Sequence, residues 1–310
     1  MAAPLIVFAY NRPDHLKKTL TALSENPEAR VSELFLFVDG PKNEAGLEAN
    51  RRVREVAASF ASGYFRSVTI RAASENKGLA RSVIEGVSEV LTRFDRVIVT
   101  EDDAVCSPYY LRFMNEALEY YRTDETVWSI GGYTVPLLLP EEYHDDVLLT
   151  QRCSSYAWAT WKDRWERVDW EMRSYPAFRW GFRERRAFNR WGDDRSLMLD
   201  DQMEGRINSW AIRFDYAMFC SGMYNILPRY SLIHSIGHDG SGTHSGADAA
   251  DPFRTDLKKA LPVHRLIRPA ADERIRRAYR AFFRCGRLDR LKLFLKHRLL
   301  QNRRKGAMNA

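Results

Sequence analysis

The stretch Val97-Ile98-Val99-Thr100-Glu101-Asp102-Asp103 decides the fold of this chain. Four β-forming residues run directly into three carboxylates, and a helix is expected to begin near Ser107-Pro108. Acidic side chains at the end of a buried strand are costly unless a cation lies beside them. In an open α/β sheet, the carboxyl ends of the strands form the edge where ligands bind. The stretch therefore predicts a divalent cation that carries a diphosphate.

Segments on the N-terminal side of this stretch alternate between strand and helix. Short apolar runs predict strands at 5–9, 34–38 and 68–71, and helical spacing predicts helices at 14–23, 45–60 and 78–91. Apolar runs without polar alternation, joined by helices, are typical of parallel strands that are covered on both faces. The expected fold class is therefore α/β, with a mostly parallel sheet flanked by helices.

Length and composition are typical of a soluble globular protein, with 310 residues of which 45% are hydrophobic and 29% charged. No stretch reaches the roughly 18 apolar residues of a membrane-spanning helix. The start, Met1-Ala2-Ala3-Pro4, leads directly into an apolar run and lacks the basic region of a signal peptide. The four cysteines include no CxxC pair, which favours free thiols in a reducing cytoplasm.

Charge is distributed unevenly along the chain. Residues 254–310 hold 18 Lys or Arg and 4 Asp or Glu, whereas residues 1–253 hold 30 basic and 37 acidic side chains. From about residue 271, Leu and Phe are interleaved with the basic residues, a pattern typical of helices at an anionic membrane surface. We therefore expect residues 254–310 to form a basic helical tail that binds such a surface, and we expect no nucleic-acid partner.

The three carboxylates are expected to have different roles, because consecutive side chains of a strand point to opposite faces. Mg²⁺ and Mn²⁺ prefer oxygen ligands and usually take one or two protein carboxylates together with substrate phosphates. Asp103 is the expected metal ligand and Asp102 the expected acceptor from a ribose hydroxyl. Glu101 is expected to contact the donor sugar or the acceptor. The alternative is an acidic turn at a helix N-terminus, where negative charge is favourable.

Four segments occur in the order found in one enzyme family. They are Tyr10-Asn11-Arg12-Pro13, Val38-Asp39-Gly40, Asn76-Lys77-Gly78-Leu79 and the stretch 97–103. Through them, residues 4–250 resemble nucleotide-sugar-dependent glycosyltransferases of the GT-A fold. The chain is similar to the N-acetylglucosaminyltransferase I family and to family-2-like bacterial sugar transferases. The resemblance implies a Rossmann-like GT-A sheet with a mixed acceptor-side subdomain.

The resemblance also implies roles for residues around the nucleotide. Asp39 is expected to accept a hydrogen bond from a uracil N–H, and Arg12 to lie near the base or the diphosphate. Asp103 would hold the metal, and Lys77 or Arg81 would face the phosphates. The segments around Asp39 and Lys77 are also ordinary turn sequences, and Arg12 is also compatible with a surface position.

An inverting reaction is implied by the resemblance to N-acetylglucosaminyltransferase I. Such a reaction needs a carboxylate that takes the proton of the acceptor hydroxyl as the anomeric carbon is attacked, while a metal stabilises the leaving diphosphate. Asp200 and Asp201 are the candidates for this base, and the sequence does not choose between them. The alternative is that they form the N-cap of a helix.

The acceptor is expected to meet aromatic side chains in the middle of the chain. Tyr156, Trp158 and Trp210 are the expected acceptor-binding residues, although most tryptophans are core residues.

The glycine-rich segment 237–246 is expected to close over the diphosphate through Ser241 and Thr243. His238 or His244, in the same segment, is a weaker candidate for a further metal or phosphate contact, and His238 is the one assigned to the metal. The alternative for the whole segment is a plain surface loop.

These patterns predict three parts and one activity. Residues 1–125 form the nucleotide-sugar-binding half, 126–253 the acceptor-binding and catalytic half, and 254–310 the basic tail. The expected activity is inverting sugar transfer, dependent on Mn²⁺ or Mg²⁺, from a nucleotide sugar, with UDP favoured, to a glycan or lipid-linked acceptor. The setting would be bacterial surface polysaccharide synthesis by a cytoplasmic protein, peripheral at the inner membrane face. The alternatives are a nucleotidyltransferase, although its glycine-rich loop is missing after the first strand, and a non-catalytic sugar-binding scaffold.

Overall fold

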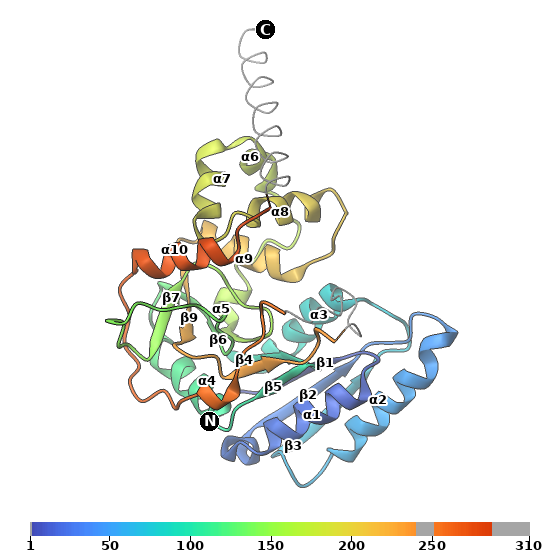
Figure 1. Ribbon diagram of the computed structural model, residues 1–310. Coiled ribbons are helices and arrows are strands. Elements are labelled where there is room, and N and C mark those ends of the chain that lie inside the picture. Colours follow the sequence, from blue (N-terminus) through green and yellow to red (C-terminus); the bar gives the residue numbers. More distant parts are fainter. Residues whose placement is uncertain (1, 240–250, 287–310) are drawn as a thin grey trace.

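The computed structural model describes residues 2–239 and 251–286, which contain an eight-stranded sheet with helices on both faces (Figure 1). Its parallel half consists of β1 (Leu5–Ala9), β2 (Glu33–Val38), β3 (Ser67–Ala72) and β4 (Arg96–Glu101), in the spatial order β3-β2-β1-β4. The predicted strands and the α/β class are confirmed. Because these strands are parallel, their carboxyl ends meet at one edge, which carries Asp39 and the triplet 101–103.

Helices cover both faces of the parallel half. They are α1 (Pro13–Ser24), α2 (Leu47–Ser59), α3 (Leu79–Leu91) and α4 (Tyr110–Tyr120), with the 3-10 turns η1 (Pro27–Val31) and η2 (Glu44–Gly46). Alternate residues of β1 enter separate cores: Leu5 and Val7 belong to the core with α1, α2 and α4, whereas Ile6 and Phe8 belong to the core with α3. Burial on both faces is the reason that these strands are apolar throughout.

The second half of the sheet is mixed, as predicted. It contains β6 (Val127–Gly131), β7 (Val147–Thr150), β8 (Ala157–Trp161) and β9 (Tyr224–Pro228), and continues the order as β4-β8-β6-β9-β7. Strand β8 is antiparallel to β4 and to β6, and β9 is parallel to β6. Strands β4, β6 and β9 therefore run in the same direction, and their carboxyl ends lie at the edge that carries the triplet.

A short two-stranded sheet follows the triplet directly. Strand β5 (Ala104–Cys106) pairs antiparallel with β10 (Ile233–Ser235). Beyond this pairing, the Ile236 N–H donates to the Asp103 carbonyl at 2.9 Å. The pairing joins segments that are far apart in the sequence and places residues 236–239 beside the triplet.

A cluster of helices connects β8 to β9. Its members are α5 (Lys162–Trp165), α6 (Tyr175–Trp180), α7 (Phe182–Phe188), η3 (Asn189–Trp191), α8 (Arg195–Met203) and α9 (Trp210–Cys220). Helices α6, α7 and α8 lie at the top of the view in Figure 1, away from β1, β2 and β3. The cluster has its own hydrophobic core, and buried ion pairs of 2.7 Å join Arg185 to Asp200 and Arg195 to Asp215.

The segment after residue 253 packs on the body of the protein. It contains the 3-10 turn η4 (Leu257–Lys259) and the helix α10 (Glu273–Phe282). Ile275 and Tyr279 of α10 are buried, and the ring of Tyr279 meets Trp191 edge-on at 5.7 Å. The apolar side of α10 is therefore part of the protein core. This corrects, for α10, the prediction that the apolar side chains of the tail face a membrane. The remainder of the predicted tail, 287–310, lies outside the described residues. Within those residues, none of the helices combines the length and apolarity needed to span a bilayer.

Candidate active site

A guanidinium group lies on the acidic triplet. Asp102 and Asp103 form the turn between β4 and β5. The Nη2 atom of Arg12 is paired with Asp102 and lies 3.0 Å from Asp103 Oδ2. The Tyr10 N–H adds a long contact of 3.4 Å to Asp102 Oδ2. Arg12 is therefore the protein's own cation at the place where the sequence requires one.

One guanidinium does not balance three carboxylates. Burial, followed by the negative charges of Asp103 and Asp102, raises the pKa of Glu101 to about 8. Burial also raises the pKa of Asp102 to about 6, against the opposing effect of Arg12. Repulsion between the neighbouring carboxylates contributes to both increases in pKa, because Arg12 does not neutralise all of the negative charge. A further cation beside the triplet would reduce this repulsion.

The donor set fits a hard divalent cation. Carboxylate oxygens are the ligands that Mg²⁺ and Mn²⁺ prefer, commonly one or two of them together with substrate phosphates. Within residues 2–239 and 251–286, no three His, Cys, Asp or Glu side chains gather around one point. A metal here would therefore rely on Asp103 and on oxygen atoms of a ligand. Asp102 is less suited, because it is 3% exposed and already bound by Arg12.

The segment 236–239 packs directly on Asp103. A β-carbon at Gly237 would lie 2.0 Å from Asp103 Oδ2 and 3.0 Å from Arg12 Nη1. A side chain at this position would therefore displace the carboxylate or the guanidinium, so the close approach requires glycine. From the sequence, Gly237 is predicted only as part of the glycine-rich segment that closes over the diphosphate.

His15 of α1 holds the same segment from another side. Its Nε2 atom is 3.1 Å from the Ile236 carbonyl oxygen and 3.1 Å from Asp239 Oδ2. His15 is not among the site residues predicted from the sequence, although its place one helical turn after Arg12 was an available signal. Ser241 and Thr243, predicted to contact the diphosphate, and His244 lie outside the described residues.

Asp39 accepts four hydrogen bonds from the surrounding loops. Its Oδ1 accepts from the N–H groups of Gly40 at 2.9 Å and Lys77 at 2.8 Å. Its Oδ2 accepts from the Gly78 N–H at 2.9 Å and from the Asn76 side-chain amide at 3.0 Å. A carboxylate has about four lone-pair sites, so this arrangement leaves none for a uracil N–H. Asp39 instead fixes the loop that precedes α3, which differs from the predicted base contact.

Lys77 and Arg81 do not pair with the triplet. Both form ion pairs with Glu85 on the exposed surface of α3, at 2.7 and 2.6 Å. Exposed pairs of this kind are weak and exchange readily, so each cation would reach a phosphate only by leaving Glu85. Among the predicted phosphate contacts that the structure describes, Arg12 is the residue that lies at the triplet.

Strand register places Tyr156 beside the triplet. The last pair of the β4–β8 ladder is Thr100 with Ala157. One residue further, Tyr156 stands opposite Glu101, and directly opposite residues of an antiparallel pair point to the same face. The side chain of Tyr156 is partly exposed. Of the residues predicted to bind the acceptor, Tyr156 is thus the one next to the acidic group.

His238 is engaged through both of its ring nitrogens. Its Nε2 atom is 3.0 Å from the Tyr156 hydroxyl, and its Nδ1 atom is 3.6 Å from Asp251 Oδ1. The imidazole also stacks on the Phe253 ring, with 5.7 Å between the ring centres and an angle of 19°. The prediction of His238 as a metal contact is therefore corrected, because both nitrogens face protein groups.

The tryptophans expected to bind the acceptor are core residues. Trp158 is 2% exposed and Trp210 is 3% exposed, and their rings stack at 4.7 Å. Trp158 also stacks on Trp165 at 5.7 Å. Neither ring presents a face to a sugar, which corrects both predictions. Trp158 is buried because β8 is an interior strand buried on both faces, and Trp210 is buried because α9 packs into the same core.

Asp200 has a structural role in α8. It has no solvent exposure, and both of its oxygens accept from Arg185, at 2.8 and 2.7 Å. The Tyr175 hydroxyl also donates to it at 2.8 Å. A carboxylate held in this way has no access to an acceptor hydroxyl, so its predicted role as the base is corrected. Asp201 is partly exposed and pairs with Arg206.

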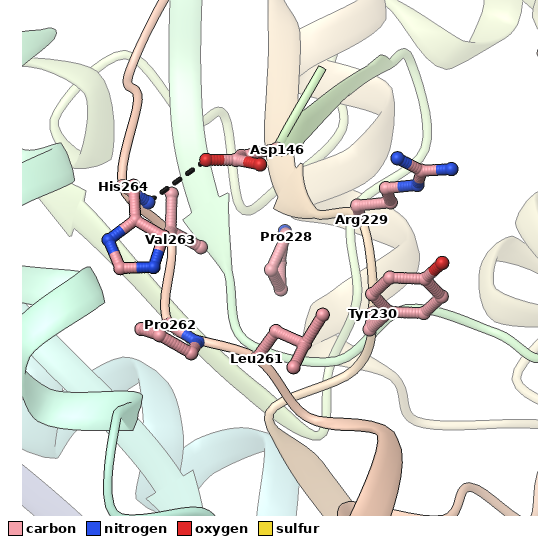
Figure 2. Close-up of a pocket in the computed structure, with 8 residues that line it drawn as sticks. All are labelled: Asp146, Pro228, Arg229, Tyr230, Leu261, Pro262, Val263 and His264. Atoms are coloured by element: carbon pink, nitrogen blue, oxygen red, sulfur yellow. Dashed lines mark hydrogen bonds between the residues drawn. The ribbon is translucent and has the colours of Figure 1, made fainter. Parts of the chain in front are cut away.

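A hollow lies at the same edge of the sheet, on its mixed half. Figure 2 shows it between the end of β9 and the segment 261–264. The residues that line it are Asp146, Pro228, Arg229, Tyr230, Leu261, Pro262, Val263 and His264. Asp146 accepts the backbone N–H of His264 at 2.9 Å and so ties the segment to the body. Tyr230 is 39% exposed and offers an aromatic ring beside this hollow.

Comparison with known proteins is consistent with this geometry. Residues 3–200 match the model of the family described as glycosyltransferase-like family 2. No curated protein matches the chain. The matched residues include Arg12 and the triplet 101–103, whereas His238 and Asp251 lie beyond them.

Proposed function

Because the chain belongs to the glycosyltransferase-like family 2, we propose that it is an inverting, metal-dependent enzyme with a UDP-sugar donor. The family assigns glycosyl transfer, and with it a nucleotide-sugar donor and an acceptor. The nucleotide, the metal, the stereochemistry and the acceptor are parts of the proposal. The resemblance to N-acetylglucosaminyltransferase I supports UDP and inversion.

The arrangement of Arg12 on Asp102 and Asp103 carries the proposal. It combines a cation with an excess of carboxylate at the sheet edge where nucleotides bind in open α/β folds. Diphosphate needs positive charge, and a divalent cation needs oxygen ligands. The site offers the guanidinium of Arg12 to the diphosphate and the carboxylate of Asp103 to the divalent cation.

Each residue of the site has a task in this reaction. Asp103 holds Mn²⁺ or Mg²⁺, which stabilises the negative charge of the leaving diphosphate when bound. Arg12 binds the diphosphate, and Asp102 fixes the position of Arg12. Gly237 allows the backbone of the segment 236–239 to lie against Asp103, close enough to exclude water from it.

On the acceptor side, we place the reacting hydroxyl beside Tyr156 and the rest of the acceptor along the sheet edge toward Tyr230. Neighbouring strands are about 4.8 Å apart. Tyr156 precedes β8 and Tyr230 follows β9, which is the second strand from β8 in the order of the sheet. The two tyrosines are therefore roughly 10 Å apart along the edge. That span supports an extended glycan or lipid-linked acceptor.

Membrane attachment and a role in surface polysaccharide synthesis belong to the same proposal. Residues 287–310 contain eight Lys or Arg and one Asp. Arg274 and Arg277 are exposed on α10, at 53% and 75% of the side chain. This positive charge supports contact with an anionic membrane surface, where each basic residue contributes about 1 kcal/mol.

Thermal denaturation with nucleotides tests the proposal. The protein is heated with UDP, GDP, CDP or dTDP, each with Mn²⁺ or with EDTA. UDP at a hundred times its dissociation constant adds about 2.7 kcal/mol to the free energy of unfolding, so the midpoint should rise by a few degrees with Mn²⁺ and little with EDTA. Asp103→Asn should lose the Mn²⁺-dependent part, whereas Asp14→Asn, an exposed control on α1, should keep it. A rise that is indifferent to metal would contradict the role of Asp103.

A further inference from the structure

Sugar transfer to a hydroxyl leaves one proton to be removed. Of the two predicted bases, Asp200 is buried in its ion pair with Arg185, and Asp201 pairs with Arg206 in the helical cluster. Neither is an unpaired carboxylate, so a group at the sheet edge beside the triplet is the better candidate to take the proton. The partly exposed Tyr156 stands there, opposite Glu101 in the strand register.

Resting on the proposed function, we propose that Tyr156, His238 and Asp251 form the proton relay of the transfer reaction. Their geometry joins them in sequence: 3.0 Å from the Tyr156 hydroxyl to His238 Nε2, and 3.6 Å from His238 Nδ1 to Asp251 Oδ1. Tyr156 is the catalytic residue that touches the acceptor, and the other two act through it.

The surroundings of His238 favour one tautomer and one ring orientation. Asp251 attracts a proton to Nδ1, which leaves Nε2 as the acceptor for the phenolic hydroxyl. Asp251 is itself fixed, because Oδ1 accepts the Phe253 N–H at 2.9 Å. The Phe253 ring lies flat on the imidazole. The 3.6 Å separation is longer than a hydrogen bond, and positive charge on the ring would shorten it.

Tyr156 remains a neutral phenol between turnovers. Burial, and after it the carboxylates of Asp103 and Glu101, raise the pKa of Tyr156. A neutral phenol has lone pairs to accept a hydrogen bond from the acceptor hydroxyl while its own proton is donated to His238. The charged and titratable groups that face this relay are Asp251 on the histidine, and Asp103, Glu101 and Tyr133 on the tyrosine.

The proton moves in step with the transfer. As the acceptor oxygen forms its bond to the anomeric carbon, the bond from that carbon to the phosphate oxygen breaks, and its electron pair leaves with the diphosphate. The acceptor proton passes to the Tyr156 oxygen while the phenolic proton passes to His238 Nε2. Tyr156 ends as a neutral phenol, and the imidazolium is stabilised by Asp251. Loss of the proton from His238 to solvent resets the relay.

The test uses the full chain and water as the acceptor, so that it does not depend on the natural glycan. Release of UDP is measured from UDP-glucose, UDP-galactose and their N-acetylamino counterparts with Mn²⁺, and the dissociation constant of UDP with Mn²⁺ is measured in parallel. Tyr156→Phe and His238→Ala should each lower kcat by about 10²-fold and leave that dissociation constant unchanged. Tyr120→Phe and His144→Ala are matched controls, because both side chains are exposed.

Chemical rescue separates a relay from a purely structural role. Added imidazole should restore UDP release in His238→Ala in proportion to its concentration, but not in Tyr156→Phe. Variants that keep the wild-type kcat, or that lose UDP affinity instead of kcat, would overturn the relay and leave the proposed function intact. A wild-type protein that binds UDP with Mn²⁺ but releases none from any donor would overturn the relay with water as acceptor. A wild-type protein that binds none of the nucleotides would overturn both proposals.

Discussion

Arg12 and Asp103 are 3.0 Å apart, measured from the guanidinium Nη2 to the carboxylate Oδ2. The oxygen that the proposed metal needs is therefore already in contact with the protein's own cation. In the proposed site, a metal ion and Arg12 would compete for Asp103 when no donor is bound. A bound donor would offer diphosphate oxygen atoms to both cations, which would end the competition.

Replacement of Arg12 by Gln should therefore act in opposite directions on two affinities. Mn²⁺ alone should bind about tenfold more tightly, because a like charge is removed from beside its ligand. UDP in the presence of Mn²⁺ should bind about 10- to 100-fold more weakly, because a charge-assisted contact contributes about 1.5–3 kcal/mol. Titration calorimetry measures both affinities. Arg51→Gln on the exposed face of α2 is the control, and weaker Mn²⁺ binding in Arg12→Gln would contradict the competition.

Gly237→Ala should impair the site more than the fold. The added β-carbon would lie 2.0 Å from Asp103 Oδ2, so the carboxylate must rotate or the segment 236–239 must move. We expect the Mn²⁺-dependent affinity for UDP to fall by about tenfold or more, equivalent to at least 1.4 kcal/mol. In Gly46→Ala, the control, the nearest atom to the new carbon is 3.7 Å away. Wild-type affinity in Gly237→Ala would show that the segment is not part of the donor site.

Asp39→Asn tests the role that the structure gives to this residue. The amide that replaces one oxygen cannot accept, so N–H groups among Gly40, Lys77 and Gly78 lose a partner. An unsatisfied buried donor costs about 1–3 kcal/mol, and urea denaturation should show a loss of this size. If Asp39 contacted the base instead, the variant would lose affinity for UDP while its free energy of unfolding stayed the same.

The sheet was predictable because local patterns encode it. The runs at 5–9 and 97–99 are apolar at every position, which marks strands buried on both faces. The triplet was predictable as a site for the same reason, since charge at the end of such a strand demands a partner. That Arg12 is the cation paired with the triplet was harder to predict. The family resemblance placed Arg12 near the base or the diphosphate, but its pairing with Asp102, 90 residues away, is a tertiary contact that no local pattern signals.

The corrected residues share one physical cause. Asp200 looks like a free carboxylate in the sequence, yet Arg185, 15 residues earlier, closes on it only when α7 and α8 pack together. Trp158 looks like a sugar platform, yet β8 becomes an interior strand only once β4 and β6 flank it. Likewise, Tyr156 and His238 are 82 residues apart, and no local spacing signals their contact.

Asp200 and Asp201 should respond differently to the same substitution. Asp200→Asn leaves the buried Arg185 without its counter-ion, and breaking a buried pair costs about 3–5 kcal/mol. Asp201→Asn removes only a pair at the surface, so its effect on unfolding should be small. Thermal and urea denaturation measure both. If Asp201→Asn releases UDP from a UDP-sugar at the wild-type rate, Asp201 has no part in the reaction.

Two truncations separate the structural and the membrane-binding parts of the C-terminal region. A chain that ends at residue 286 keeps α10, whose Tyr279 packs on Trp191 and whose Arg280 pairs with Asp193 at 2.9 Å. A chain that ends at residue 270 loses the helix and exposes the surface that it covers. We expect the first truncation to leave the free energy of unfolding unchanged and the second to lower it by several kcal/mol, because two large buried side chains are removed.

Binding to vesicles that contain anionic phospholipid should follow the opposite order. The chain that ends at residue 286 lacks eight basic side chains, and each contributes about 1 kcal/mol near such a surface. Co-sedimentation should therefore drop sharply with this truncation, while its thermal midpoint and its UDP affinity stay at the wild-type values. Raising the salt concentration should release the full chain from the same vesicles, because the attraction is screened within a Debye length of about 8 Å. Equal co-sedimentation of the two chains would exclude residues 287–310 as the attachment and leave the exposed arginines of α10, Arg274 and Arg277, as the remaining basic surface to test.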